Sequence, residues 1–215
     1  MKMSKRIDKN KSHQKERGQS LVEVALTLPI LLMLLSGLVE FGFILNHYLA
    51  IVDATREVAR ISSNWSHEYV NGDGDSFYDV AIGKVVYALE PNDANDTTRK
   101  IKIRENRVNC SADDALTGVC DNEIIISVYG IDSGGASLVA QHHWDDDDPR
   151  QASRISETVI NDRISGIPNT SAGVVVVEVF YNYEQVLGLP WVPIQDPLLL
   201  YSYTMMPLSS AEPES

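Results

Sequence analysis

The sequence predicts an α+β protein, in which a long amino-terminal transmembrane helix continues into an extracytoplasmic domain with a mostly antiparallel sheet. Three observations predict this class. An apolar run of membrane length occupies residues 24–45, a helical apolar spacing continues beyond it, and stretches rich in β-branched residues follow in the second half of the chain. Helices and strands that occupy separate parts of one chain are typical of α+β proteins.

The first element is a basic leader over residues 1–18, with seven Lys or Arg residues and two acidic ones. The positive-inside rule therefore places the amino terminus in the cytoplasm and everything after about residue 46 outside it. The rest of the chain holds all but two of the 30 acidic residues. This acidic exterior argues against nucleic acid and anionic lipid surfaces as partners, and it fits one extracytoplasmic domain over residues 63–215.

The apolar run of residues 24–45 follows, and about 22 residues make roughly 33 Å of helix, enough to cross a bilayer core. Glu23 at its start and Glu40 within it need an explanation, because carboxylates in the membrane are costly. The simplest role for Glu23 is that of a helix cap near the headgroups. A secretory signal peptide is the competing interpretation of the segment, but the run exceeds the usual 7–15 residues and no clear small-x-small site follows.

Beyond the span, apolar residues keep the 3.6-residue spacing and charged residues lie on the other side. The apolar positions are Ile51, Val52, Ala54, Val58, Ala59 and Ile61, and the charged ones are Arg56, Glu57 and Arg60. We therefore expect a single helix over residues 20–62. A membrane helix followed by a separate short helix is the alternative, since no proline decides between them.

Several short motifs around the span carry a resemblance to a known family. They are Arg17-Gly18-Gln19-Ser20-Leu21-Val22-Glu23, Ala25-Leu26-Thr27-Leu28-Pro29, Val39-Glu40-Phe41-Gly42 and Ala54-Thr55-Arg56-Glu57-Val58-Ala59-Arg60. In these motifs the chain resembles the type IV prepilin-like proteins, and among them the TadE-like pseudopilins of the Tad (tight adherence, Flp) pilus system. The resemblance covers residues 17–62, with a weaker likeness over 175–206.

The resemblance implies that a prepilin peptidase cuts after Gly18, so that Gln19 becomes the amino terminus of an assembly helix over residues 19–62. It also implies that Glu23 pairs with the free amine of a neighbouring subunit and sets the register between subunits. The chain would then be a non-enzymatic minor pilin or pseudopilin of the cytoplasmic membrane, with pilin-like subunits and the Tad assembly machinery as partners. The alternative is an uncleaved single-pass membrane protein with an extracytoplasmic ligand- or calcium-binding domain.

An acidic segment after the long helix resembles a calcium-binding loop. Asn71, Asp73, Asp75 and Asp79 fall at loop positions one, three, five and nine. Ser76 replaces the glycine of the sharp turn and Ile82 replaces the closing glutamate, so a solvated turn is the favoured interpretation and weak calcium binding the alternative.

The remaining elements are read from local patterns. A helical pattern occupies residues 78–89, an amphipathic one occupies 151–164, and strand-like stretches occupy 99–108, 123–129, 174–183 and 198–206. Cys110 and Cys120 are the only cysteines, and outside the cytosol a disulfide between them is favoured over free thiols or a zinc site.

For catalysis the sequence offers little. The adjacent histidines His142 and His143 are the nearest approach to a catalytic cluster, but neighbours in a strand or loop point to opposite sides. No nucleophile elbow, phosphate loop or zinc-helix motif is present in the sequence. We therefore expect a protein that acts through helix packing and not through catalysis.

Overall fold

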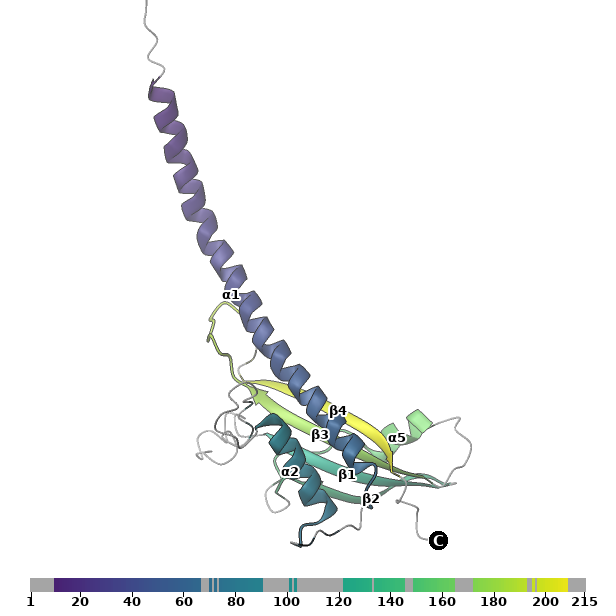
Figure 1. Cartoon of the computed structure of the whole chain (residues 1–215). Coiled ribbons are helices and arrows are strands. Elements are labelled where there is room, and N and C mark those ends of the chain that lie inside the picture. The colour runs from purple at the N-terminus through teal and green to yellow at the C-terminus, as the bar shows by residue number, and fades with distance from the viewer. Residues whose placement is uncertain are drawn as a thin grey trace, which may run out of the picture. The chain divides into compact units, whose positions relative to one another are not determined.

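The computed structural model describes residues 10–66, 70, 72, 74–90, 101, 103, 122–132, 134–145, 149–164, 172–192, 195 and 197–208, with the backbone only at 10–19, 164 and 172. The chain divides into two compact units, which are described separately. The first comprises Met1–Phe43 with Val186–Pro193, and the second Ile44–Gln185 with Ile194–Ser215. The described helices and strands confirm the α+β class (Figure 1). The boundaries expected from the sequence at residues 18 and 62 stay predictions.

The helix α1 is one continuous element over Asn10–Ser62, which confirms the single helix and extends it toward the amino terminus. Pro29 lies inside it, where it lacks the N–H that would bond to the carbonyl four residues earlier. Hydroxyl groups near the proline bond to the same helix, since Thr27 Oγ1 donates to the carbonyl of Glu23 at 3.0 Å. Local side-chain bonds of this kind satisfy polar groups where no water is available.

The sheet of the second unit has four strands in the order β2-β1-β3-β4, and every neighbouring pair is antiparallel. The strands are β1 (Glu123–Asp132), β2 (Gly135–His143), β3 (Ala172–Tyr183) and β4 (Leu198–Leu208). The continuous β-branched run of β3 fits its central place, because a strand covered on both faces is apolar throughout. Three of the predicted strands are thus confirmed.

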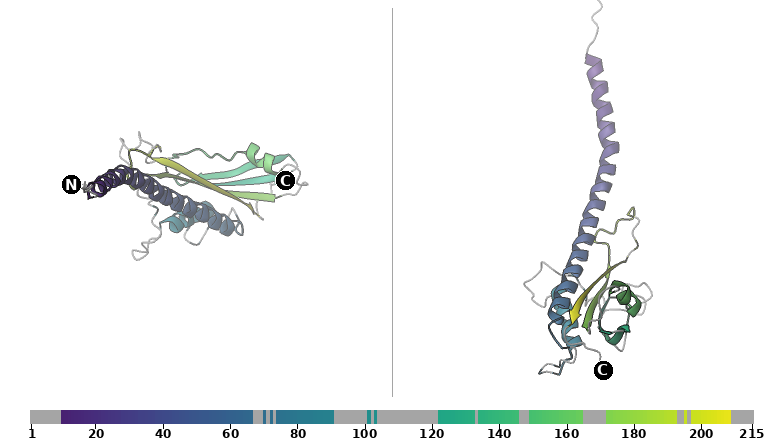
Figure 2. Two further views of the ribbon diagram at one scale, coloured as in Figure 1. Left: turned by 90° about the horizontal axis from the view of Figure 1, so that it is seen from above. Right: turned by 90° about the vertical axis from the view of Figure 1, so that its right-hand side faces the viewer.

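Two helical segments cover one face of this sheet, and a third helix lies against the other (Figure 2). The first face carries residues 44–62 of α1 together with α2 (Phe77–Leu89), and the second carries α5 (Glu157–Ile164). Successive side chains along a strand point to opposite faces of the sheet, so the buried apolar residues form two separate hydrophobic clusters. The larger cluster joins Ile51, Val58, Phe77, Val85, Ile124, Ile126, Val177 and Val179, and the smaller one joins Tyr129, Ile155, Ile160 and Val176.

The second half of α1 packs on the sheet with the face that its sequence pattern predicts. Ile51, Ala54, Val58 and Ala59 are buried, while Arg56, Glu57 and Arg60 are exposed. Thr55 is also buried, and its hydroxyl lies 3.3 Å from the Ser202 hydroxyl and accepts a bond from Thr204 Oγ1 at 3.2 Å. We refer to the buried face of this segment, Ala54, Thr55, Val58 and Ala59, as the docking surface of the helix, and Thr55 bonds it to β4.

Two local predictions are corrected by the structure. The helix expected over residues 151–164 begins only at Glu157, because Ser153 Oγ and the Arg154 N–H donate to the Glu178 carboxylate and hold the preceding residues as a loop. The edge strand β2 was not predicted at all. Most of its side chains are exposed or half-buried, so its sequence carries little apolar alternation.

The remaining predictions fall partly outside the described residues. Cys110 and Cys120 lie there, so their disulfide stays a prediction. Most of the strand expected at 99–108 lies there too, although Ile101 and Ile103 are described, are buried and belong to no strand. The helix expected over 78–89 is confirmed as α2, which starts one residue earlier.

Candidate functional site in the amino-terminal helix

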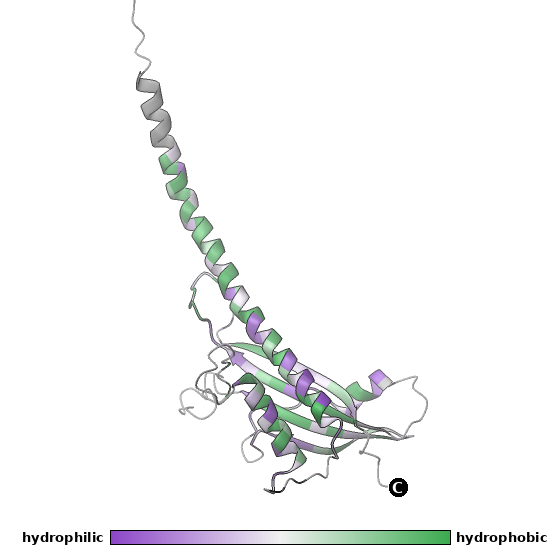
Figure 3. Ribbon diagram, in the orientation of Figure 1, coloured by the Kyte–Doolittle hydropathy of each residue, from purple (hydrophilic) through white to green (hydrophobic). Residues whose placement is uncertain are grey.

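The membrane-length part of α1, from Ser20 onward, is mostly hydrophobic in sequence (Figure 3). Between Ser20 and Val39 every residue is exposed except Ser36 and Gly37, which are half-buried. Leu34 and Leu38 are each 70% exposed. Among the described residues this is the one helix long and apolar enough to cross a membrane. A helix that is apolar all round is stable in lipid or against other apolar helices, but not in water.

The residues singled out for cleavage and registration all lie on this helix. Gly18 and Gln19 are in α1, where only their backbone is described, and Glu23 is exposed. Gln19 and Glu23 are four residues apart, so they share one face of the helix.

A second carboxylate of the helix, Glu40, is fully buried. Its Oε1 accepts a hydrogen bond from the Val186 N–H at 3.0 Å, and its Oε2 accepts one from the Leu187 N–H at 2.9 Å. Both donors belong to the segment of the first unit that returns to the helix near the carboxyl end of the chain. Hydrogen bonds from backbone N–H groups offset the cost of burying a carboxylate.

We refer to residues 186–192 as the 186–192 loop. Gly188 has a φ of +54°, a left-handed conformation that favours glycine, and the Val192 N–H donates to the Leu189 carbonyl at 3.2 Å. Sequence reasoning missed the contact with Glu40. The available signal was a carboxylate inside the apolar run, which implies a partner without saying where in the chain it lies.

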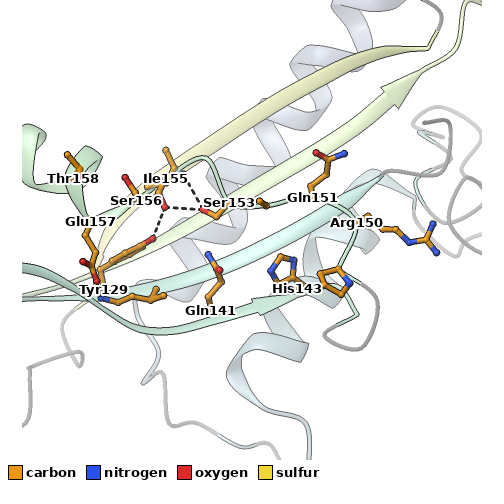
Figure 4. A pocket seen from close by; sticks show the side chains of 13 residues that line it. Tyr129, Gln141, His143, Arg150, Gln151, Ser153, Ile155, Ser156, Glu157 and Thr158 are labelled. Carbon is orange, nitrogen blue, oxygen red and sulfur yellow. Dashed lines mark hydrogen bonds between the residues drawn. The ribbon is translucent and has the colours of Figure 1, made fainter. Parts of the chain in front are cut away.

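The second unit contains a pocket of about 670 Å³ on the α5 side of the sheet (Figure 4). Part of its polar lining bonds to other parts of the fold. The Tyr129 hydroxyl donates to the Ile155 carbonyl at 2.7 Å, and the Leu138 N–H donates to Glu157 Oε1 at 2.9 Å. Burial raises the pKa of the Tyr129 hydroxyl, as the carboxylates of Glu178 and then Glu157 also do. These bonds attach the 149–158 segment to the sheet.

Two fully buried carboxylates on the same face, Glu123 and Glu178, fix the loops around the pocket. Glu123 Oε1 accepts from the Trp144 N–H at 3.1 Å, and its Oε2 accepts from the Arg150 N–H at 2.7 Å. The Tyr201 hydroxyl donates to Glu178 at 2.8 Å, and burial followed by this bond raises the pKa of that hydroxyl. Both carboxylates thus organise the polypeptide around the pocket.

The paired histidines point to opposite faces, as the strand geometry predicts. The His142 ring stacks on Tyr78 with centroids 4.0 Å apart, whereas His143 lines the pocket with Nδ1 3.8 Å from Glu123 Oε2. Both histidines are half-buried. His47 packs against Tyr181 and Tyr183 with centroids 5.9 and 5.0 Å away.

The calcium candidate is only partly within the described chain. Asn71 and Asp73 lie outside it, Asp75 precedes the cap of α2, and Asp79 Oδ2 accepts from the Ser76 N–H at 2.9 Å and from its hydroxyl at 2.6 Å. Asp79 and Ser76 thereby form a capping box. In the described ranges no group of three or more His, Cys, Asp or Glu residues could hold a metal ion. Calcium binding stays a prediction.

The family model described as TadE-like protein matches residues 18–60. This segment is TadE-like. The match begins at Gly18 and ends at Arg60, so it covers the exposed apolar half of α1, Glu40 and the docking surface on β4. Neither the curated proteins nor the solved structures give a match to the chain.

The TadE-like match and the apolar helix agree in what they indicate. TadE-like proteins are associated with Tad pili and are in general not enzymes, and one apolar amino-terminal helix indicates a single-pass membrane anchor. The TadE-like segment therefore combines two surfaces on one helix, one suited to lipid and one suited to the sheet.

Proposed function

We propose that this TadE-like chain is a membrane-anchored minor pilin or pseudopilin that takes part in assembling a Tad-type adhesion or secretion pilus. The observation that carries the proposal is the exposed and mostly apolar segment 20–39 of α1, with Glu23 near its start. Such a helix is stable in a bilayer and can exchange lipid for the apolar helices of partner subunits. The function is thus performed by packing.

Cleavage after Gly18 by a prepilin peptidase is the first step of the proposed function. It removes the basic leader and leaves the α-amine of Gln19 one helical turn from Glu23. In the assembled state the Glu23 carboxylate pairs with the Gln19 amine of an adjoining subunit. Each charge then has a partner in surroundings where an isolated charge is strongly unfavourable.

The proposed topology has the leader in the cytoplasm and the sheet domain outside the inner membrane. The leader's excess of Lys and Arg supports this orientation by the positive-inside rule. The partners in this scheme are a prepilin peptidase, pilin-like subunits and the Tad assembly machinery.

Amino-terminal sequencing of the chain recovered from membranes tests the cleavage. In cells that contain the peptidase we expect a mature chain that begins at Gln19, and we expect Gly18→Leu to block processing because a side chain crowds the peptidase site. The variant Ser20→Ala is the matched control and should be processed normally. A wild-type chain that still begins near Met1 would contradict the proposal.

The Glu23→Gln variant tests the registration role. It should reach normal abundance in the membrane, because removing a charge from the span eases insertion. Pilus formation and crosslinking to partner subunits should fall, because the neighbouring amine loses its counter-charge. Glu57→Gln, at an exposed position of the docked half, is the matched control and should assemble normally.

Normal pili and normal crosslinks with Glu23→Gln would remove the registration role. Together with an uncut amino terminus, they would favour the rival function, a single-pass membrane protein that displays an extracytoplasmic ligand- or calcium-binding domain. A cut amino terminus with normal Glu23→Gln assembly would instead retain the pilin and assign Glu23 to a helix cap.

A further inference from the structure

The 186–192 loop exposes apolar side chains, and it lies beside a helix that is long and apolar enough to span a membrane. Val186 is 57% exposed, Leu187 42% and Trp191 47%. No residue between Val186 and Ile194 carries a charge. Exposed apolar side chains on an uncharged loop are favourable sites for an apolar partner.

The level of the loop along the helix is fixed by Glu40. Its carboxylate accepts hydrogen bonds from the Val186 and Leu187 N–H groups, so the start of the loop is at the height of Glu40 along the helix axis. Glu40 precedes Leu45, the end of the apolar run, by five residues, which corresponds to about 8 Å of helix rise. The loop is therefore beside the last part of the spanning segment, near the boundary between hydrocarbon and headgroups.

The polar backbone of the loop is already satisfied at several points. Two of its N–H groups bond to Glu40, and the Val192 N–H bonds to the Leu189 carbonyl. Pro190 has no N–H to satisfy. Irregular backbone is tolerated near hydrocarbon only where its N–H and C=O groups bond to protein. The three N–H groups named above each have a protein acceptor.

We propose that the 186–192 loop is a second membrane contact, which lies in the interfacial layer on the side of the sheet domain. The structure supports lipid as the occupant because the loop continues the apolar surface of the span and places a tryptophan at its boundary. Tryptophan is enriched at that depth, where its ring is apolar and its N–H reaches polar headgroups. Glu40 is the positioning residue, and the Val186 and Leu187 N–H groups donate hydrogen bonds to its carboxylate.

This inference rests on the membrane anchor in the proposed function but not on cleavage or assembly. The test uses the full chain in phosphatidylcholine vesicles that contain lipids brominated at different depths, which quench nearby tryptophan fluorescence. Trp65→Phe and Trp144→Phe together leave Trp191 as the only tryptophan. A matched chain retains Trp65 alone, and another places the only tryptophan in the span through Leu35→Trp.

We expect shallow bromines to lower Trp191 emission about twofold or more, since interfacial rings lie close to that depth. Trp65 emission should stay unchanged, and the Leu35→Trp emission should respond to deep bromines. Unquenched Trp191 beside a quenched Leu35→Trp marker would overturn the loop contact while leaving the anchor intact. Blue-shifted but unquenched Trp191 emission would assign the loop to a protein partner and overturn lipid as its occupant. If the marker is also unquenched, the anchor itself fails, and the loop contact fails with it.

The variant Glu40→Ala tests the positioning role. Without the carboxylate, the Val186 and Leu187 N–H groups lose their acceptor, so Trp191 emission should shift to longer wavelength and lose most of its quenching. The Leu35→Trp marker should be unaffected, and Glu57→Ala is the matched control, since it removes an exposed carboxylate of the same helix. Unchanged Trp191 quenching in Glu40→Ala would show that Glu40 does not position the loop.

Discussion

The two halves of α1 belong to one helix but have opposite relations between polarity and exposure. The segment Ser20–Ser62 contains an 18-residue window with a mean hydropathy of 2.3, of which only 6% is buried, and no residue between Ser20 and Val39 is buried. Residues 44–62 include Asp53, Arg56, Glu57 and Arg60, yet they bury Ile51, Val58 and Ala59 almost completely. Hydropathy alone therefore does not tell which half packs within the chain.

The arrangement of the side chains explains this difference. The docked half confines its apolar residues to one stripe, and small residues such as Ala54 and Ala59 allow the helix to lie close to the sheet. Residues 24–39 carry no charged side chain on any face, so this part of the helix has no polar side to turn toward water. Its hydroxyl groups also bond to their own helix, whereas the Thr55 hydroxyl bonds to β4 as well. The first half is suited to contact with lipid or with the apolar helices of partners, and the second half is suited to packing in this chain's own core.

The largest effect is expected from a charge in the docked half. Val58 is 1% exposed, and Val58→Asp should destabilise the domain by about 4 kcal/mol or more, because a buried carboxylate would lack partners. Urea unfolding of the full chain in detergent measures this. Glu57→Ala, on the exposed side, is the control and should change the free energy of unfolding by less than about 0.5 kcal/mol. An unchanged midpoint in Val58→Asp would mean that this half is not docked.

The same substitution in the other half should act on the membrane instead. Leu34→Asp lies near the middle of the apolar run and should reduce insertion by about 2.5–3.5 kcal/mol. We expect the fraction of protein that resists alkaline extraction from membranes to fall, while the unfolding midpoint of the sheet domain stays the same. Leu34→Phe is the apolar control. Full resistance to extraction in Leu34→Asp would contradict a spanning role for this half.

A pH titration tests the packing of the docked half against β3. Burial, with further contributions from Glu184 and Glu90, raises the pKa of Tyr181 to about 12 from its ordinary value of 10.0. The unfolded chain therefore loses the Tyr181 proton at a lower pH than the folded chain. The contribution of this group to the free energy of unfolding is fully present below pH 10 and is lost as the pH rises toward 12. Two pKa units correspond to about 2–3 kcal/mol.

Tyr181→Phe should remove that part of the alkaline loss, as measured by chemical unfolding at pH 9 and at pH 12. Some loss should remain, because burial raises the pKa of Tyr78 to about 12 as well. Tyr87→Phe, at a position 61% exposed, is the control. If the Tyr181→Phe and wild-type profiles coincide, then Tyr181 is not buried against the helix.

The smallest effect is expected from the hydroxyl contacts. Thr55→Val keeps the shape of the side chain but removes its bonds to Ser202 and Thr204, which should cost about 1 kcal/mol of domain stability. Thr27→Val is the matched substitution in the exposed half, and it should leave domain stability within about 0.5 kcal/mol of the wild type. Equal losses in both variants would contradict a difference between the halves.

Periodic patterns predicted the elements whose side chains have regular surroundings. The continuous β-branched run predicted β3 and the 3.6-residue stripe predicted the docked face of α1, because burial on a regular element repeats with its geometry. The edge strand β2 was missed since half of its environment is solvent, and the helix over 151–164 was drawn too long. Its first residues are held as a loop by Glu178, a partner from another strand that no local pattern reveals.

For the candidate site, the sequence by itself determined the spanning run, the TadE-like motifs and the positions of Gly18, Gln19 and Glu23 along one helix, since these depend only on local composition and spacing. Only the tertiary structure decided what becomes of the other carboxylate in the run. Glu40 meets the N–H groups of Val186 and Leu187, which are 146 and 147 residues away. A contact across such a separation depends on tertiary structure, and no local pattern in the sequence reveals it. The sequence therefore shows that Glu40 needs a partner, whereas the fold supplies it.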